Sequence, residues 1–239
     1  MRGLFVTATD TDVGKSILSA ALLAAMAAEG EPVRAFKPVV TGLEHQAGPP
    51  AEGAWPPDHE LLANAAGMSP DEVAPLRFGP AVSPHLAAQL AGERIDVDAL
   101  LASARVSAAG ATLIVEGVGG LLVPLTEDYS VCDLAVALGL PVLIAARPGL
   151  GTINHTLLTL RAARAAHLEV RAVVLTPWPR RTDAIERSNR ETIARLGEVE
   201  VETLEQLAGP GAGELARAGA ALPWRRWLEP GRRGRQDPS

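Results

Sequence analysis

Apolar runs alternate along the chain with stretches in which apolar and polar residues follow a helical period. The apolar runs are nearly continuous in Val, Leu, Ile and Ala, which is typical of strands covered on both faces. They predict strands at Gly3–Thr7, Val33–Pro38, Thr112–Glu116, Pro141–Ala146, Val170–Thr176 and, more weakly, Val199–Thr203. The periodic stretches predict helices at Gly14–Ala28, Asp58–Ala66, Val97–Ala108, Ser130–Leu138, Ile153–Ala166, Asp183–Leu196 and near Ala212–Ala218. This alternation predicts an α/β fold with a parallel sheet between two layers of helices.

Length and composition fit one globular domain. The 239 residues are 47% hydrophobic and 21% charged, which is ordinary for such a protein. We expect a single domain over residues 1–224 and a disordered, Arg-rich tail over residues 225–239. The Gly/Pro-rich segment Leu43–Pro57 predicts a loop long enough to have a functional or mobile role.

Charge and cysteine content exclude several functions. The net charge of −6 argues against a general nucleic-acid binder, which needs a basic surface, but allows a local site for a small anion. Cys132 is the only cysteine, so an intrachain disulfide and a Cys-based zinc site are excluded, and a reducing cytoplasm is the expected location. The most apolar long window, residues 131–146, contains Asp133 and Pro141 and falls short of the ~20 residues of a membrane span.

A candidate phosphate loop lies between the first predicted strand and the first predicted helix. Gly14-Lys15-Ser16 matches the second half of the G-x-x-x-x-G-K-[ST] pattern, although Thr9 stands at its first glycine. Backbone N–H groups at the start of a helix point at an anion. Lys15 can place a positive charge on the β- and γ-phosphates, and the Ser16 hydroxyl can bind Mg²⁺. The segment therefore predicts nucleotide binding.

Further candidates follow other predicted strands. Lys37 ends the second strand, and Glu116 directly follows an apolar strand, where an acidic residue commonly holds Mg²⁺. The glycine-containing turn at residues 149–154 opens a helix and predicts a second anion site, suited to a carboxylate. His85 precedes a helical run, and it is a weaker candidate because a lone histidine is more often structural than catalytic.

Several motifs together resemble one enzyme family. They are Thr9–Ser16, Lys37-Pro38-Val39, Thr41-Gly42, Asp58, Ser83-Pro84-His85, Val115–Gly120 and Gly149–His155. In order and spacing, from the start of the chain to about Thr176, they resemble the dethiobiotin synthetases. The resemblance implies a P-loop NTPase-like three-layer sandwich, a mostly parallel sheet of about seven strands, and a homodimer with active sites at the interface.

The resemblance also implies a reaction. The substrates would be 7,8-diaminopelargonate, CO₂ (as bicarbonate) and ATP, with Mg²⁺ as cofactor. A carbamate on one amine would attack the γ-phosphate, and the second amine would then close the ureido ring and release phosphate. Neither nucleic acid nor a membrane takes part.

Roles of individual residues are implied by the same resemblance. Lys37, Lys15 and Thr11 would be catalytic, and Ser16, Asp58 and Glu116 would bind Mg²⁺. The nucleotide site would comprise Asp12, Val13, Gly14, Lys15, Ser16, Ile17, Asp58, Glu116, Gly117, Val118, Gly119, Thr176 and Pro177. The substrate would contact Thr41 and, from the partner subunit, Gly149, Leu150, Gly151, Thr152, Ile153 and Asn154.

The chain departs from the family pattern at three places. Ala8 stands where a glycine is usual. Thr176-Pro177 replaces an Asn-Asp pair that reads adenine, and the proline has no N–H to donate. Glu200-Val201-Glu202 replaces a Pro-rich nucleotide contact. We therefore hypothesise relaxed base selectivity, with CTP or GTP used nearly as well as ATP.

Two alternatives remain open at this point. A related amidoligase of the cobyrinate-synthase type shares the phosphate loop but typically carries an amidotransferase domain, for which this chain has no room. A partition-type ATPase switch uses a further lysine near the start of the loop, and none precedes Lys15. Of the 22 basic residues only Lys15 and Lys37 are lysines, and both lie at predicted strand ends. A compact ammonium is not interchangeable with a guanidinium there, which favours phosphoryl chemistry at both positions.

Overall fold

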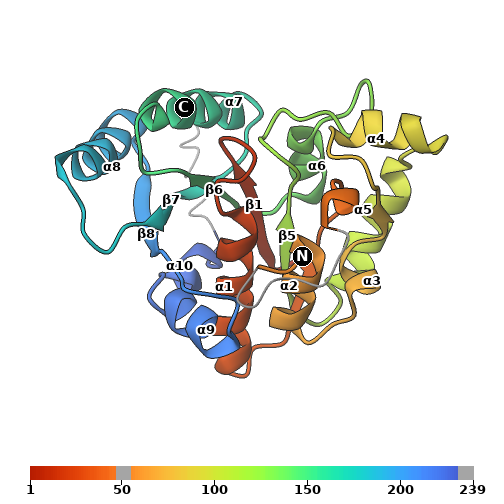
Figure 1. Cartoon of the computed structure of the whole chain (residues 1–239), viewed down its shortest axis with the longest axis horizontal. Helices are drawn as coiled ribbons and strands as arrows, with labels where there is room; N and C mark the ends of the chain where they lie inside the picture. Colours follow the sequence, from red (N-terminus) through yellow and green to blue (C-terminus); the bar gives the residue numbers. More distant parts are fainter. Residues whose placement is uncertain (47–54, 231–239) are drawn as a thin grey trace, which may run out of the picture.

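The computed structural model describes residues 1–46 and 55–230, and a parallel sheet of six strands lies at its centre. The strand order is β2-β5-β1-β6-β7-β8 (Figure 1). The strands are β1 (Gly3–Ala8), β2 (Val33–Phe36), β5 (Thr112–Glu116), β6 (Val142–Ala146), β7 (Val170–Trp178) and β8 (Glu200–Glu205). The predicted α/β class is confirmed, but the expectation of about seven strands is wrong. After β8 the described chain continues only into helices, so β8 remains the edge of the sheet.

Helices cover both faces of this sheet, giving the expected three layers (Figure 1). Side chains of four helices pack on one face: α1 (Lys15–Ala28), α2 (Asp58–Ala66), α9 (Ala212–Ala220) and α10 (Trp224–Trp227). The other face is covered by side chains of α5 (Val97–Ser107), α6 (Val131–Leu138), α7 (Thr152–Ala165) and α8 (Ala184–Gly197). All of the strongly periodic segments therefore form the predicted helices.

Shorter elements between β2 and α5 were not predicted from the sequence. Two two-residue strands, β3 (Val39–Val40) and β4 (Leu76–Arg77), pair in parallel outside the main sheet. A 3-10 helix (Leu43–Gln46), α3 (Pro70–Val73) and α4 (Pro84–Ala91) complete this region. Elements of two to four residues are too short to produce a readable hydrophobic period, and α4 was anticipated only as a helical run. The core of the predicted loop Leu43–Pro57 lies outside the described residues.

The domain extends beyond the predicted boundary at residue 224. Trp227, in α10, is 1% exposed, and its Nε1 donates to Glu200 Oε1 at 2.9 Å. Arg226 forms an ion pair with the other oxygen of that carboxylate at 2.5 Å. The two tryptophans flanking Arg225 and Arg226 are buried and anchor this part of the Arg-rich segment. The rest of the predicted tail, residues 231–239, lies outside the described residues.

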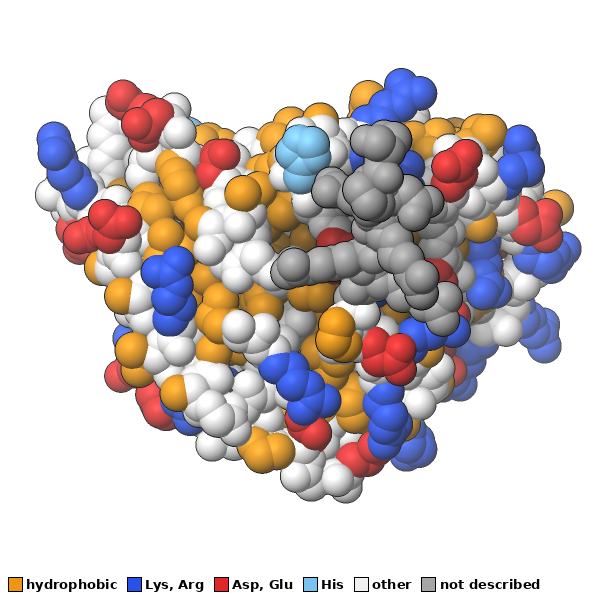
Figure 2. All heavy atoms as spheres, turned by 180° about the vertical axis from the view of Figure 1, so that it is seen from behind, with side chains coloured by type: hydrophobic (Ala, Val, Ile, Leu, Met, Phe, Trp, Pro, Cys, Tyr) orange, Lys and Arg blue, Asp and Glu red, His pale blue; other side chains and the backbone are white. Residues whose placement is uncertain are grey.

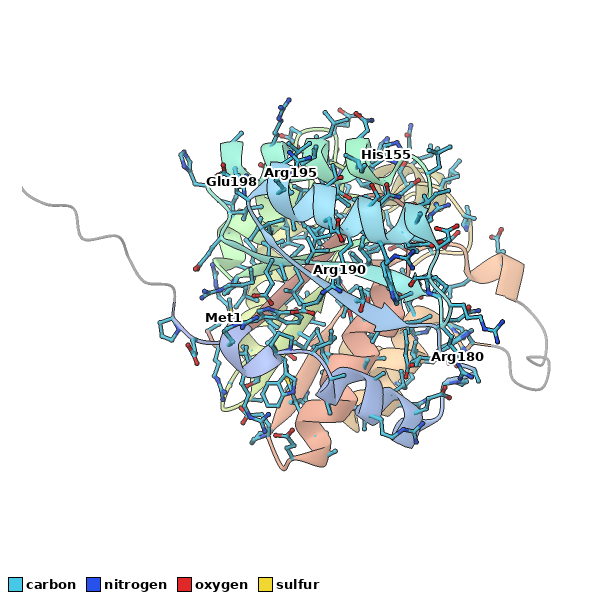
Figure 3. All side chains as sticks on the ribbon, turned by 90° about the vertical axis from the view of Figure 1, so that its left-hand side faces the viewer. Met1, His155, Arg180, Arg190, Arg195 and Glu198 are labelled. Carbon is cyan, nitrogen blue, oxygen red and sulfur yellow. The ribbon has the colours of Figure 1, made fainter. Side chains whose placement is uncertain are left out.

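The edge strand β8 is covered by polar side chains. Arg190 extends from α8 toward β8, and its Nε donates to the Val201 carbonyl at 3.1 Å (Figure 3). Polar cover of this kind limits pairing with another strand. Acidic and basic side chains are interspersed on the face shown in Figure 2. Within the described part of the chain, no helix has the length and apolar character needed to cross a membrane.

Candidate active site

Strand register places the candidate side chains together. Phe36 of β2 pairs with Val115 of β5, so Lys37 and Glu116 are the next residues on two neighbouring parallel strands. Val6 of β1 pairs with Glu116 itself, and the phosphate loop follows β1 directly. Because the carboxyl ends of parallel strands meet at one edge of a sheet, these groups converge there.

A cleft of about 420 Å³ opens at this edge. It is lined by twelve of the sequence-predicted site residues: Thr11, Asp12, Gly14, Lys15, Ser16, Ile17, Lys37, Thr41, Asp58, Val118, Gly119 and Pro177. Residues that follow β1, β2 and β5 thus share one cavity with the start of α2. A cleft with few, convergent charged groups is the usual form of a ligand site.

The phosphate loop has the backbone needed for an anion site despite its irregular sequence. Asp12 (φ 55°) and Gly14 (φ 94°) both adopt left-handed conformations. Gly14 is the N-cap of α1, and no side chain caps the helix, so its first N–H groups stay available to an anion. Ala8 is fully buried at the end of β1, paired with Ala145, so its methyl group is accommodated below the loop.

Lys37 lies between two carboxylates on the floor of the cleft. Its Nζ donates to Asp58 Oδ2 at 2.7 Å and to Glu116 Oε1. Lys37 is 3% exposed and Glu116 is 0% exposed. Burial alone would lower the pKa of Lys37, but the charges of Asp58 and Glu116 outweigh it and raise that pKa above its ordinary value. Lys37 is therefore a buried but charge-compensated ammonium.

Lys15 has a different environment a short distance away. Its Nζ donates to the Asp10 carbonyl at 3.1 Å, and it has no direct carboxylate partner among the described residues. Burial lowers the pKa of Lys15, and the attraction of Glu116 only partly opposes this. A buried ammonium with little compensation is well placed to receive a phosphate.

Ser16, Asp58 and Glu116 fit the requirements of a magnesium site. Ser16 Oγ donates to Glu116 Oε1 at 2.8 Å. Asp58 is linked to the same carboxylate by Lys37, whose Nζ donates to both acids. The second carboxylate oxygen, Glu116 Oε2, is buried and has no hydrogen-bond partner within residues 1–46 and 55–230. The described residues contain no group of three or more His, Cys, Asp or Glu side chains that could hold a metal ion. Two carboxylates and a hydroxyl suit Mg²⁺, which takes its remaining ligands from water and phosphate.

The other predicted residues lie beside or away from the cleft. Val13, Gly117 and Thr176 are buried and do not line it; Thr176 lies against the phosphate loop, where a side chain on Gly14 would meet its Cγ2 at 3.0 Å. The segment Gly149–Asn154, at the start of α7, does not line the cleft; Leu150 and Thr152 line a smaller hollow of about 100 Å³ that borders the phosphate loop at Asp10 and Val13. His85 lies in another hollow with Glu93 and Arg94, so this structure does not join it to the cleft.

Four apolar residues of the cleft were not predicted from the sequence. They are Val40, Trp55, Pro56 and Leu61. Trp55 also packs against the core cluster formed by α1 and α2. A tryptophan at the end of a Gly/Pro-rich segment is a weak signal, and no motif marks it.

A parallel sheet with a lysine-bearing phosphate loop after its first strand defines a P-loop nucleotide-binding protein, and the model of the AAA domain family matches residues 2–208. An ATP-dependent dethiobiotin synthetase of Anaeromyxobacter sp. (strain Fw109-5) is 43% identical over 82% of this chain and 86% of its own. One from Bacillus subtilis (strain 168) is 35% identical over 82% and 83%. The chain belongs to the dethiobiotin synthetase family.

A solved structure supports the fold independently. The cell division protein complex MinC:MinD from Aquifex aeolicus gives a TM-score of 0.53 at 12% identity, covering 92% of this chain and 95% of that chain. At this identity the likeness concerns the arrangement of the elements alone.

Proposed function

We propose that this chain catalyses the ATP-dependent ring closure of 7,8-diaminopelargonate with CO₂ to dethiobiotin, releasing ADP and phosphate. The observation that carries the proposal is the convergence of Lys15 and Lys37 in one cleft with Ser16, Asp58 and Glu116. The reaction develops negative charge on a carbamate and on a transferring phosphoryl group. Two ammonium groups in a water-poor site oppose that charge without any reorganisation of solvent.

The reaction needs no protein nucleophile. One substrate amine binds CO₂ and loses a proton, giving a carbamate. A carbamate oxygen attacks the γ-phosphorus of ATP, and the bond to the ADP oxygen breaks. The second amine attacks the carbonyl carbon of the resulting mixed anhydride, loses a proton and displaces phosphate. The substrate supplies both nucleophiles, so the protein binds, orients and neutralises charge.

The polar residues of the cleft other than Asp12 have the following roles in this proposal. Lys15 and the N–H groups at the start of α1 hold the β- and γ-phosphates. Lys37 holds the carbamate and the anhydride, and Thr11 and Thr41 orient the substrate. Ser16, Asp58 and Glu116 hold Mg²⁺, which would neutralise phosphate charge when bound. The proposed place of action is the cytoplasm, where the free thiol of Cys132 remains reduced.

A homodimer is part of the proposal. The predicted carboxylate site, Gly149–Asn154, contributes no residue to the lining of the cleft in its own protomer, which agrees with delivery to a partner. Leu150 in that segment is 100% exposed, and Leu122, after β5, is 67% exposed. Apolar side chains of this kind on the active-site edge favour burial against a second copy.

Base selectivity is the second part of the proposal. Pro177 lines the cleft but has no N–H, and Thr176 is buried beneath the loop. With little polar readout of the base, CTP and GTP should support turnover nearly as well as ATP. Initial rates with each triphosphate measure this, and a hundredfold preference for ATP would contradict it.

The decisive test is turnover with each substrate left out in turn. We expect phosphate release and dethiobiotin formation only when the diamine, bicarbonate, Mg²⁺ and ATP are all present. Dethiobiotin is measured by mass spectrometry and phosphate by a coupled assay. ATP hydrolysis that proceeds equally well without the diamine would indicate a switch ATPase instead.

A further inference from the structure

The ammonium of Lys37 occupies the point where the oxygen ligands of the cleft converge. Glu116 Oε1 accepts from both Lys37 Nζ and Ser16 Oγ, while Asp58 Oδ2 accepts from Lys37 at 2.7 Å. These three oxygen-bearing residues are also the ones that fit Mg²⁺. A cation bound to Glu116 and Asp58 together would lie where this ammonium lies.

We infer that Lys37 and the divalent cation are alternative occupants of one position, so that each excludes the other. Lys37 donates to both carboxylates, and Glu116 is 0% exposed, so a cation bound to the same two oxygens would lie against the ammonium and be repelled by it in a medium of low polarity. When Mg²⁺ arrives with the nucleotide, the ammonium must leave the carboxylates. The exchange turns Lys37 toward the substrate.

This inference rests on the proposed function for the group that Lys37 contacts after the exchange. It adds that the divalent cation binds before Lys37 contacts the substrate. The protein without nucleotide should take up divalent cations poorly, because Lys37 already occupies Asp58 Oδ2 and Glu116 Oε1. Lys37 should gain an anionic partner only after the cation has arrived. A carbamate would then meet an ammonium released from two carboxylates rather than one already compensated.

Binding of Mn²⁺ to the nucleotide-free protein tests the exchange without any catalytic step. Electron paramagnetic resonance counts free Mn²⁺ during a titration. We expect Lys37→Met to bind Mn²⁺ at least about tenfold more tightly than the wild type, because the competing charge is gone. Lys37→Arg keeps that charge and should stay within about threefold of the wild type.

Lys15→Met is the matched control for a general loss of positive charge. Lys15 is also buried, but among the described residues its Nζ donates to a backbone carbonyl and to no carboxylate, so its removal should tighten Mn²⁺ binding by less than about threefold. Equal gains in the two methionine variants, or no gain in Lys37→Met, would overturn the exchange. The synthetase assay is separate, so a chain that hydrolyses ATP without the diamine could still show the exchange.

The wild-type protein offers a second measurement if Lys37→Met does not fold. Lysine labelled with ¹³C at Cε gives only two signals, because the chain has only Lys15 and Lys37. Addition of a non-hydrolysable ATP analogue with Mg²⁺ should move the Lys37 signal, whereas Mg²⁺ alone should leave it nearly unchanged. A Lys37 signal that stays fixed when both are bound would overturn the inference.

Discussion

Two buried lysines stand at the floor of one cleft and have opposite electrostatic environments. Lys37 donates to two carboxylates, and its pKa is raised although burial opposes this. Lys15 donates to the Asp10 carbonyl, and burial lowers its pKa. Both are less than a tenth exposed, at 3% and 7%, so burial does not explain the difference.

The hydrogen-bond partners explain the difference in pKa, and they imply different roles for the two lysines. The charge of Lys37 is already compensated in the free protein, so this residue must exchange partners to act on an anion. The charge of Lys15 is poorly compensated, so an incoming phosphate supplies what is missing. The Lys37 half of the cleft, with its two carboxylates, is therefore stable without a ligand. The Lys15 half gains stability when a phosphate binds.

Removing each lysine should produce the largest contrast in stability. We expect Lys37→Met to lower the free energy of unfolding by about 3–5 kcal/mol, because it leaves Glu116 buried without its cation. Lys15→Met should change it by less than about 1 kcal/mol or raise it, because an uncompensated buried charge is lost. Urea denaturation at pH 7 measures both, and equal losses would remove the distinction between the two halves.

The two carboxylates that hold Lys37 should also differ from each other. Glu116 is fully buried, whereas the side chain of Asp58 is 47% exposed. We expect Glu116→Gln to cost about 2–3 kcal/mol, because a buried charge pair is broken, and Asp58→Asn to cost less than about 1 kcal/mol, because water screens the exposed partner. Calorimetric or urea unfolding would separate them. A larger loss from Asp58→Asn would place the main partner of Lys37 at the start of α2 instead.

The pH dependence of the two lysines should differ in direction. Lys15 should lose its proton below the ordinary value of 10.5, and Lys37 should keep its proton beyond it. The unfolded chain then binds more protons than the native state at Lys15, so this residue makes stability rise as pH approaches 10.5. The stabilisation from Lys37 is fully present below 10.5 and is lost as pH rises above it. The ¹³C-lysine signals follow both titrations, and a Lys37 that titrates first would contradict the assignment.

Most of the fold could be read from the sequence because long periodic segments carry it. The six apolar runs became the six strands, and a parallel sheet then brings Lys15, Lys37 and Glu116 to one edge. The irregular phosphate loop was readable because a strand precedes it and a helix follows it.

The remainder depends on contacts that no local pattern contains. Trp55 lines the cleft and packs against a core cluster whose members come from as far along the chain as α9 and α10. Trp227 anchors the start of the Arg-rich segment through Glu200, a partner 27 residues away. Lys37 and Glu116 are 79 residues apart in the sequence. The sequence therefore predicted a substrate role for Lys37 and a magnesium role for the two acids, but it did not predict that they pair with one another.

The smallest expected change in unfolding free energy concerns two serine hydroxyls, one that donates to the carboxylate paired with Lys37 and one that does not. Ser16 and Ser19 both lie on α1, but Ser16 Oγ donates to Glu116 at 2.8 Å, while the buried Ser19 Oγ has no hydrogen-bond partner in the part of the chain that the structure describes. We expect Ser16→Ala to cost about 1 kcal/mol of unfolding free energy, and Ser19→Ala to be neutral or slightly stabilising. Urea denaturation of the two variants in parallel measures the difference. Equal costs would mean that the Ser16 bond adds nothing to the compensation of Glu116, and that Lys37 alone holds this carboxylate in the resting protein.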